Sequence, residues 1–71
     1  MDTIEKTSER IGREYRERRK AVGLTQVELA ARSGITEFTI CNLERGQASP
    51  TLGTLKALHD ALTDAEPKRA A

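Results

Sequence analysis

Several features that other protein classes depend on are scarce in this chain. Its 71 residues include one cysteine, which excludes an internal disulfide and a cysteine-based zinc site and suits a reducing compartment. Tryptophan is absent, and one phenylalanine and one tyrosine offer little aromatic surface for stacking on single-stranded bases. There is no apolar run of about 20 residues, the length that spans a membrane. The first ten residues, MDTIEKTSER, are too charged for a signal peptide, so we expect one small cytoplasmic domain without a membrane segment.

The net charge is only +1, which is low for a protein that binds nucleic acid, so its distribution matters more than its total. Seven basic residues and four glutamates lie from Glu5 to Lys20, a local excess of 7 − 4 = +3. This segment is either a basic surface or an ordinary solvated helix. The second interpretation rests on Arg10, Glu14 and Arg18, whose spacing of four residues is that of helical ion pairs.

The most informative pattern is in residues 26–45, QVELAARSGITEFTICNLER. It predicts two short helices separated by a tight turn at Gly34, because glycine takes a positive φ without steric cost. Apolar residues stand where the two helices would touch: Leu29, Ala30, Ile35, Ile40 and Leu43. This arrangement is typical of a helix-turn-helix, in which the second helix enters the DNA major groove.

Local signals predict where these two helices begin and end. Thr25 and Glu28 have the spacing of a capping box, so the helix before the turn begins there and ends at Ser33. Thr36 is expected to cap the next helix, which we place over 36–45.

Two further helices are expected to flank this pair. The first runs from Ser8, or from as far back as Thr3, to Gly23. The last begins at Thr51 or at Ser49. Its leucines are expected to form one apolar stripe that closes the core: Leu52, Leu55, Leu58 and Leu62. No stretch alternates with the period of a strand, so we predict an all-α fold.

From about Tyr15 to Leu62 the chain resembles the Cro/cI-type, or XRE, family of helix-turn-helix domains. The motifs that carry the resemblance are GLTQVELA, SGIT, ICNLERG and SPTLGTLKAL. The resemblance implies a compact bundle of four or five helices, of the lambda-repressor-like type, that binds duplex DNA as a transcriptional regulator. We expect an N-terminal extension over 1–10, the helix-turn-helix domain over 11–62 and a polar tail over 63–71.

Four residues of the second helix of the pair are expected to meet base edges: Glu37, Phe38, Cys41 and Asn42. Ile40 and Leu43 face inward, so these others face outward, and the resemblance assigns base reading to three of the four positions (Glu37, Phe38 and Asn42). Asn42 suits a bidentate pair with adenine, worth about 1–3 kcal/mol of discrimination. Phe38 either covers a thymine methyl group or folds onto its neighbours. Glu37 either accepts a hydrogen bond from a cytosine amino group or stabilises the helix N-terminus with its negative charge.

Phosphate contacts are expected at the ends of both helices: Thr25, Gln26, Thr36, Thr39, Arg45 and Gln47. The backbone N–H and side-chain amide of Gln26 would point at a phosphate beside the positive end of its helix, and the resemblance implies the same role. The alternative is an ordinary solvated residue at a helix start. Arg45 and Gln47 flank Gly46, where they could bind a second phosphate. The alternative for Arg45 is a structural one, since a cation at a helix C-terminus interacts favourably with the helix dipole.

Arg19 and Glu44 are interpreted as structural residues. Arg19 lies on the apolar face of the first helix, and in similar domains an Arg and a Glu at these positions form a partly buried ion pair. No pair of acids, nucleophile with a base, or metal cluster is apparent in the sequence, so we predict neither an enzyme nor a bound cofactor or metal.

Two hypotheses for the function follow. The first is a stand-alone, sequence-specific regulator that binds duplex DNA as a homodimer: a phage-like repressor, a restriction-modification controller or an autoregulating antitoxin. Similar domains often carry a fifth helix, which in several subgroups builds the dimer interface, and the segment after Leu62 is too short and polar to form a full one. The second is a protein-interaction module of the same fold, such as an antitoxin that binds a toxin, and Glu37 on the reading helix slightly favours it. The salt dependence of DNA binding separates the two.

Overall fold

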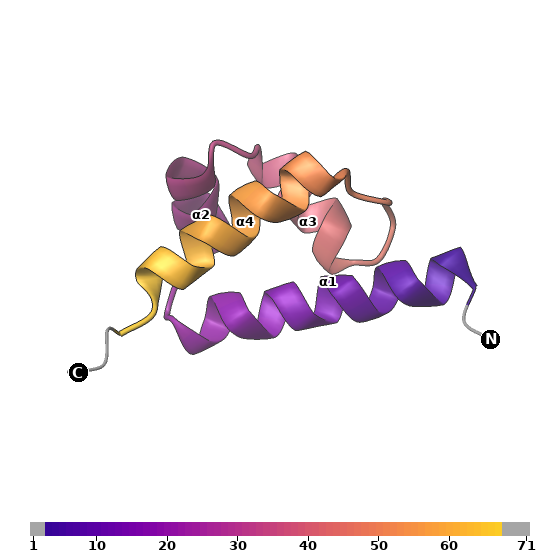
Figure 1. The fold of residues 1–71 in the computed structure, drawn as a ribbon, viewed down its shortest axis with the longest axis horizontal. Coiled ribbons are helices and arrows are strands. Elements are labelled where there is room, and N and C mark those ends of the chain that lie inside the picture. Colours follow the sequence, from indigo (N-terminus) through magenta and orange to yellow (C-terminus); the bar gives the residue numbers. More distant parts are fainter. Residues whose placement is uncertain (1–2, 68–71) are drawn as a thin grey trace.

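Each helix in the described part of the chain begins after a threonine. The computed structural model describes residues 3–67, with helices α1 (Ile4–Ala21), α2 (Gln26–Ser33), α3 (Glu37–Glu44) and α4 (Leu52–Ala65) (Figure 1). Each threonine hydroxyl accepts the backbone N–H three residues on, at 3.0–3.2 Å: Thr3, Thr25, Thr36 and Thr51. Such a cap satisfies an N–H that the helix leaves unpaired and contributes about 1 kcal/mol. Residues 3–67 contain no strand, and the predicted all-α fold is confirmed.

The predicted signals around α2 are confirmed. The capping box is complete, since the Thr25 N–H donates to Oε1 of Glu28 and the Glu28 N–H donates to Oγ1 of Thr25, both at 3.0 Å. α2 ends at Ser33, and Gly34 takes the left-handed conformation with φ of 76°. Its N–H closes the helix by donating to the carbonyl of Ala30. The turn therefore depends on a backbone conformation that glycine adopts most readily.

The observed ends of α1 and α4 distinguish between the alternative helix bounds that the sequence left open. α1 begins directly after Thr3, so the expected boundary between residues 1–10 and the domain falls inside one continuous helix. α4 begins after Thr51 and not at Ser49, and it runs to Ala65, beyond the expected start of the tail. The division into extension, domain and tail stays a prediction, and residues 1–2 and 68–71 lie outside the described part of the chain.

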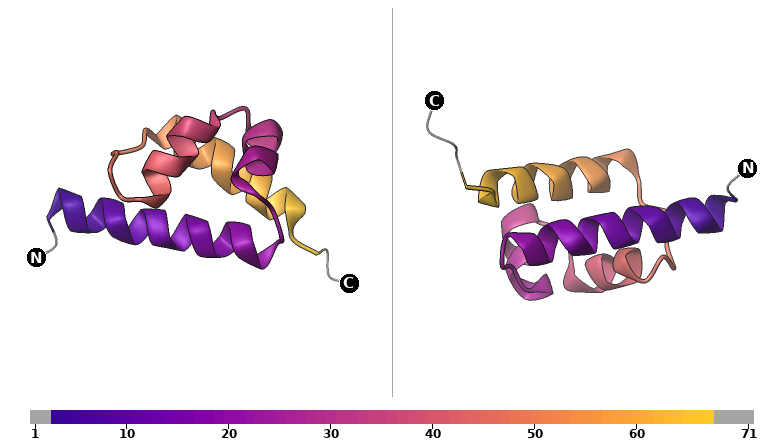
Figure 2. Two further views of the ribbon diagram at one scale, coloured as in Figure 1. Left: turned by 180° about the vertical axis from the view of Figure 1, so that it is seen from behind. Right: turned by 90° about the horizontal axis from the view of Figure 1, so that it is seen from below.

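α1 lies along one side of the molecule and the other three helices stack on it (Figures 1 and 2). Seen from below in Figure 2, α4 runs along one edge of α1 and the α2–α3 pair runs along the other. α3 covers the N-terminal half of α1, whereas α2 sits near its C-terminal end. The α2–α3 pair of the predicted helix-turn-helix is thus held on one side of α1, and α2 also packs against α4.

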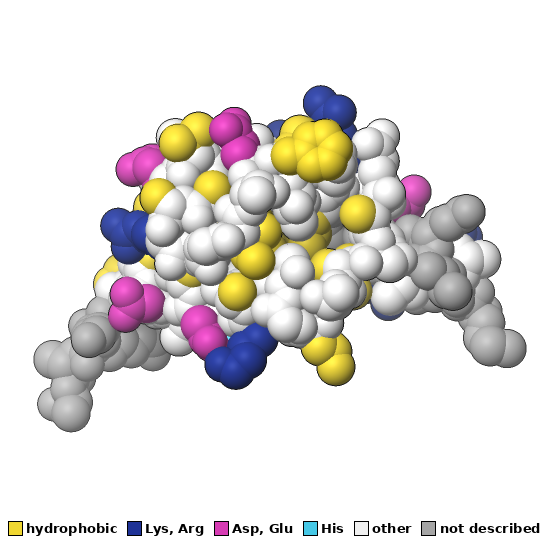
Figure 3. Space-filling model, turned by 90° about the horizontal axis from the view of Figure 1, so that it is seen from above, with side chains coloured by type: hydrophobic (Ala, Val, Ile, Leu, Met, Phe, Trp, Pro, Cys, Tyr) yellow, Lys and Arg dark blue, Asp and Glu magenta, His cyan; other side chains and the backbone are white. Residues whose placement is uncertain are grey.

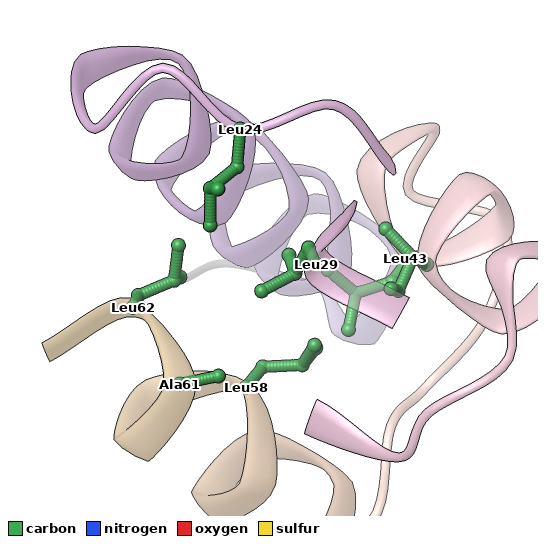
Figure 4. Close-up of a cluster of buried hydrophobic side chains, with 7 residues drawn as sticks. Leu24, Leu29, Leu43, Leu58, Ala61 and Leu62 are labelled. Carbon is green, nitrogen blue, oxygen red and sulfur yellow. The ribbon is translucent and has the colours of Figure 1, made fainter. Parts of the chain in front are cut away.

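The core is a cluster of aliphatic side chains from α2, α3, α4 and the segment before α2, which point toward one another in Figure 4. Its buried members are Leu24, Leu29, Ile40, Leu43, Leu58, Ala61 and Leu62. Each fully buried leucine or isoleucine contributes about 1.5–3 kcal/mol relative to exposure. Ala30, Ile35 and Leu55 are partly buried and pack against this cluster, so the apolar contacts predicted between α2 and α3 are formed.

The predicted leucine stripe of α4 is wrong at one position. Leu52 is 84% exposed, while Leu58 and Leu62 are buried. Because a helix turns by 100° per residue, Leu52 lies about 120° around the helix from Leu58. It therefore points away from the face that meets α2, and the stripe begins at Leu55.

Gly12 allows α1 to approach the end of α3. It is buried, and a Cβ atom placed there would overlap the carbonyl oxygen of Leu43 and lie 3.2 Å from that of Glu44. A side chain of any size would separate the two helices. Glycine is therefore required at this contact because it has no Cβ atom, and not because of an unusual backbone φ. It sets the distance between α1 and the last turn of α3.

Candidate nucleic-acid interface

The outer face of α3 is open to solvent. Ile40 and Leu43 are 1% and 2% exposed, whereas Phe38 on the opposite side is 75% exposed. Asn42 lies one turn beyond Phe38 on the same side and is half-buried. Glu37 is exposed and Cys41 is half-buried, so all four residues predicted to meet base edges have surface on this face. Figure 3, a view of the molecule from above, shows hydrophobic side chains scattered over that side with acidic and basic side chains among them.

The N-terminus of α3 is organised by two threonines. The Thr36 hydroxyl accepts the Thr39 N–H at 3.2 Å and donates its own proton to the Thr39 Oγ1 at 2.9 Å. The Thr39 hydroxyl proton has no acceptor among residues 3–67, which leaves it as the donor at this corner of the helix. Both residues predicted to contact phosphate here are at the surface, Thr36 exposed and Thr39 half-buried.

The N-terminus of α2 is tied to the end of α3 by Glu44. Gln26 donates its side-chain Nε2 proton to Oε1 of Glu44 at 3.2 Å. Thr25 is exposed beside it, held by the capping box. One amide proton of Gln26 is therefore committed to the protein, and the second amide proton and the backbone N–H at the helix start remain for a ligand.

Arg19 and Glu44 form a bidentate ion pair between α1 and α3. Nε of Arg19 donates to Oε2 of Glu44 at 2.8 Å, and Nη2 donates to Oε1 at 2.9 Å. The remaining Nη1 donates to the carbonyl of Leu24 at 2.8 Å. The hydrogen bond with Glu44 raises the pKa of Arg19 above its ordinary value, although burial acts in the opposite direction. The guanidinium of Arg19 therefore keeps its positive charge beside Glu44.

A surface hollow of about 340 Å³ lies where α1, α2 and α3 meet. Its walls are Arg16, Gln26, Cys41, Glu44 and Arg45. The hollow thus joins two residues predicted to contact phosphate, Gln26 and Arg45, with Cys41 from the face predicted to read bases. Gln47 lies beyond Gly46 and is exposed, and its backbone N–H donates to the carbonyl of Asn42.

Arg16 is the residue of this site that the sequence did not single out. In the sequence, Arg16 stands out only as one of seven basic residues along the first helix. A signal was present, because Arg16 precedes Arg19 by three residues and so lies about one turn away on the same helix. Once Arg19 is paired with Glu44, Arg16 must lie near the end of α3.

Two other kinds of site are not found in residues 3–67. No group of three His, Cys, Asp or Glu side chains is arranged to hold a metal ion. No helix in the same part of the chain has both the length and the apolar character needed to cross a bilayer.

Comparison with known proteins gives a match to the helix-turn-helix family over residues 16–63, more than half of the chain. An uncharacterised HTH-type transcriptional regulator of Methanothermobacter thermautotrophicus is 60% identical over 37 residues, which cover 52% of this chain and 54% of that protein. Another from Sinorhizobium fredii is 42% identical over 52 residues, 73% of this chain and 68% of its own. A second S. fredii regulator is 42% identical over 55 residues, but only 28% of its length is matched. The chain therefore spans about half the length of the first of these relatives.

Proposed function

We propose, from the premise that this chain belongs to the Cro/cI-type helix-turn-helix family, that it is a transcriptional regulator that binds duplex DNA in a sequence-specific manner. The relatives named as HTH-type transcriptional regulators support the regulatory role. The observation that carries the proposal is the α2–α3 pair itself: α3 is anchored by Ile40 and Leu43 and has Phe38 open to solvent. No catalytic step is part of the proposal.

In the proposed complex, α3 lies in the major groove. Asn42 pairs with an adenine, Phe38 covers a thymine methyl group, and Glu37 accepts from a cytosine amino group. Cys41 lies beside them as a small neutral contact. The exposure of Phe38 supports this arrangement, since a large apolar side chain is 75% open to solvent on the face that would enter the groove.

Phosphate contacts hold the two helices across the groove in this proposal. They come from the starts of α2 and α3 and from the end of α3: Thr25, Gln26, Thr36, Thr39, Arg45 and Gln47. Helix N-termini suit phosphates because their free N–H groups and the helix dipole both favour an anion. Such contacts fix the position of the protein but carry no sequence information directly.

We further propose that the protein acts in the cytoplasm as a homodimer on a two-fold operator. Helix-turn-helix dimers place their reading helices in half-sites about 34 Å apart, one turn of DNA. A phage-like repressor, a restriction-modification controller and an autoregulating antitoxin all fit this description.

A mobility-shift titration against the DNA upstream of the protein's own gene tests the proposal. We expect binding that resists competitor DNA, that Asn42→Ala weakens selectively for the operator, and that Gln26→Ala weakens for every duplex. Measurements at two salt concentrations should show a steep dependence, because each neutralised phosphate releases counterions. Binding that neither substitution weakens would overturn the proposed placement of α3 in the major groove.

The alternative function, a protein-interaction module such as an antitoxin that binds a toxin, is favoured by one observation. Phe38 exposes a large apolar surface next to the acidic Glu37, a combination that also fits a protein partner. Co-purification of a partner that Phe38→Ala releases, together with no DNA binding, would favour this second function.

A further inference from the structure

We infer that the hollow at the junction of α1, α2 and α3 holds one phosphate of the DNA backbone, and that Arg16 is its principal donor. This inference rests on the proposed function and deepens it, because it adds a residue of α1 to contacts otherwise drawn from α2 and α3. We call this site the phosphate hollow; its walls are Arg16, Gln26, Cys41, Glu44 and Arg45.

The phosphate hollow carries two uncommitted positive charges. The guanidinium groups of Arg16 and Arg45 make no hydrogen bond or ion pair with any residue of the described range 3–67, and both residues are exposed. An arginine presents planar N–H donors that match phosphate oxygens in pairs. Arg16 comes from α1 and Arg45 from the end of α3, so the two can approach one phosphate from different directions.

The one acid in the wall does not oppose an anion. Oε2 of Glu44 accepts from Arg19 at 2.8 Å, and Oε1 accepts from Arg19 at 2.9 Å and from Gln26 at 3.2 Å. The Glu44 side chain is only 4% exposed. Its charge is therefore compensated inside the protein, and the net charge that faces the hollow is positive.

Gln26 adds directional donors to this charge. Its bond to Glu44 orients the amide at the first position of α2, where the helix N-terminus also favours an anion. The volume of about 340 Å³ exceeds the roughly 30 Å³ of one water by enough to hold a phosphate group with its bridging waters. Charge, donors and space thus converge at one place on the surface.

The first test compares two charge-matched variants on a short duplex of mixed sequence. Arg16→Gln removes the proposed donor, and Arg32→Gln removes an exposed arginine from the last turn of α2 that does not line the hollow. We expect Arg16→Gln to lower the slope of log K against log salt by about 0.9, the value for one phosphate, while Arg32→Gln leaves the slope unchanged. Thermal melts should match the wild type, because Arg16 has no partner within residues 3–67.

Cys41 provides a second readout at the site itself. It is half-buried, lines the hollow and is the only cysteine of the chain, so its alkylation by iodoacetamide reports on this position alone. Because Cys41 is also proposed to meet base edges, a duplex would shield it without a phosphate in the hollow, so the probe here is inorganic phosphate. Inorganic phosphate should slow alkylation of the wild-type protein, and it should slow alkylation of Arg16→Gln less.

The outcomes separate this inference from the function on which it rests. Wild-type binding to the duplex together with an unchanged slope in Arg16→Gln would overturn the phosphate hollow and leave the DNA-binding proposal standing. An equal decrease of the salt slope in Arg16→Gln and Arg32→Gln would also overturn it, because the decrease would then reflect the overall charge of the protein and not a contact in the hollow. A wild-type protein that binds no duplex at low salt would overturn both.

Discussion

Glu44 accepts two hydrogen bonds from the guanidinium of Arg19, at 2.8 and 2.9 Å, across 25 residues of sequence. The two side chains are only 4% and 11% exposed, so the pair is nearly closed to water. Glu44 also accepts from Gln26 at the start of α2. One carboxylate therefore joins the three helices that surround the candidate interface, and the position of the proposed phosphate contacts depends on it.

Arg19→Met should destabilise the fold strongly. The substitution keeps an apolar stem but leaves the Glu44 carboxylate buried without its cation, which costs about 3–5 kcal/mol. Urea unfolding followed by circular dichroism would measure the free energy of unfolding. Arg13→Met on the exposed side of α1 is the control and should change it by no more than about 0.5 kcal/mol. Equal stability of the Arg19 variant and the wild type would contradict a structural role for the pair.

Gly12→Ala and Gly53→Ala should have opposite effects. At Gly12 the new methyl group would collide with the Leu43 carbonyl, and the forced separation of α1 from α3 should cost about 1–3 kcal/mol. At Gly53 the nearest atom is the Thr51 hydroxyl at 3.8 Å, so alanine should stabilise α4 by up to about 1 kcal/mol. Thermal melts of the two variants are the measurement. A neutral Gly12→Ala would mean that α1 can move away from α3 without cost.

The capping box of α2 should make stability depend on pH. The hydrogen bond from the Thr25 N–H holds the pKa of Glu28 below its ordinary value, because it favours the ionised carboxyl. The stabilisation is fully present above the ordinary glutamate pKa and is lost as the pH falls through the lowered folded-state value. The difference in unfolding free energy between wild type and Glu28→Ala should therefore shrink in acid. A difference that stays constant with pH would show that the carboxylate contributes nothing.

Phe38→Ala should affect DNA recognition and not the fold. Phe38 is 75% exposed, so its loss should change the free energy of unfolding by about 0.5 kcal/mol or less. If Phe38 covers a thymine methyl group, wild-type protein should bind more weakly to an operator in which uracil replaces that thymine. Phe38→Ala should be insensitive to the same replacement. Wild-type binding that tolerates every such replacement would exclude the methyl contact.

The local features of the fold could be predicted from the sequence because they depend on residues three or four positions apart. The capping box of Thr25 and Glu28, the Thr36 cap and the left-handed Gly34 all occupy their predicted places. The helical period likewise identified Ile40 and Leu43 as inward-facing. These interactions close within one turn of helix, so a short window of sequence contains both partners.

The tertiary structure decided what depends on helices distant in sequence. Leu52 belongs to a leucine series along the chain, but the neighbours of α4 bury the side of the helix that carries Leu58 and leave Leu52, about 120° around the helix, in solvent. Gly12 carries no local signal, and its role follows from the α3 carbonyls that lie against it. Arg16 and Arg45 share one hollow only because α1 and α3 are packed side by side. The sequence by itself determined the four helices and both ends of α2, through contacts within each turn. Packing between helices determined which side chains meet and which remain open to a ligand.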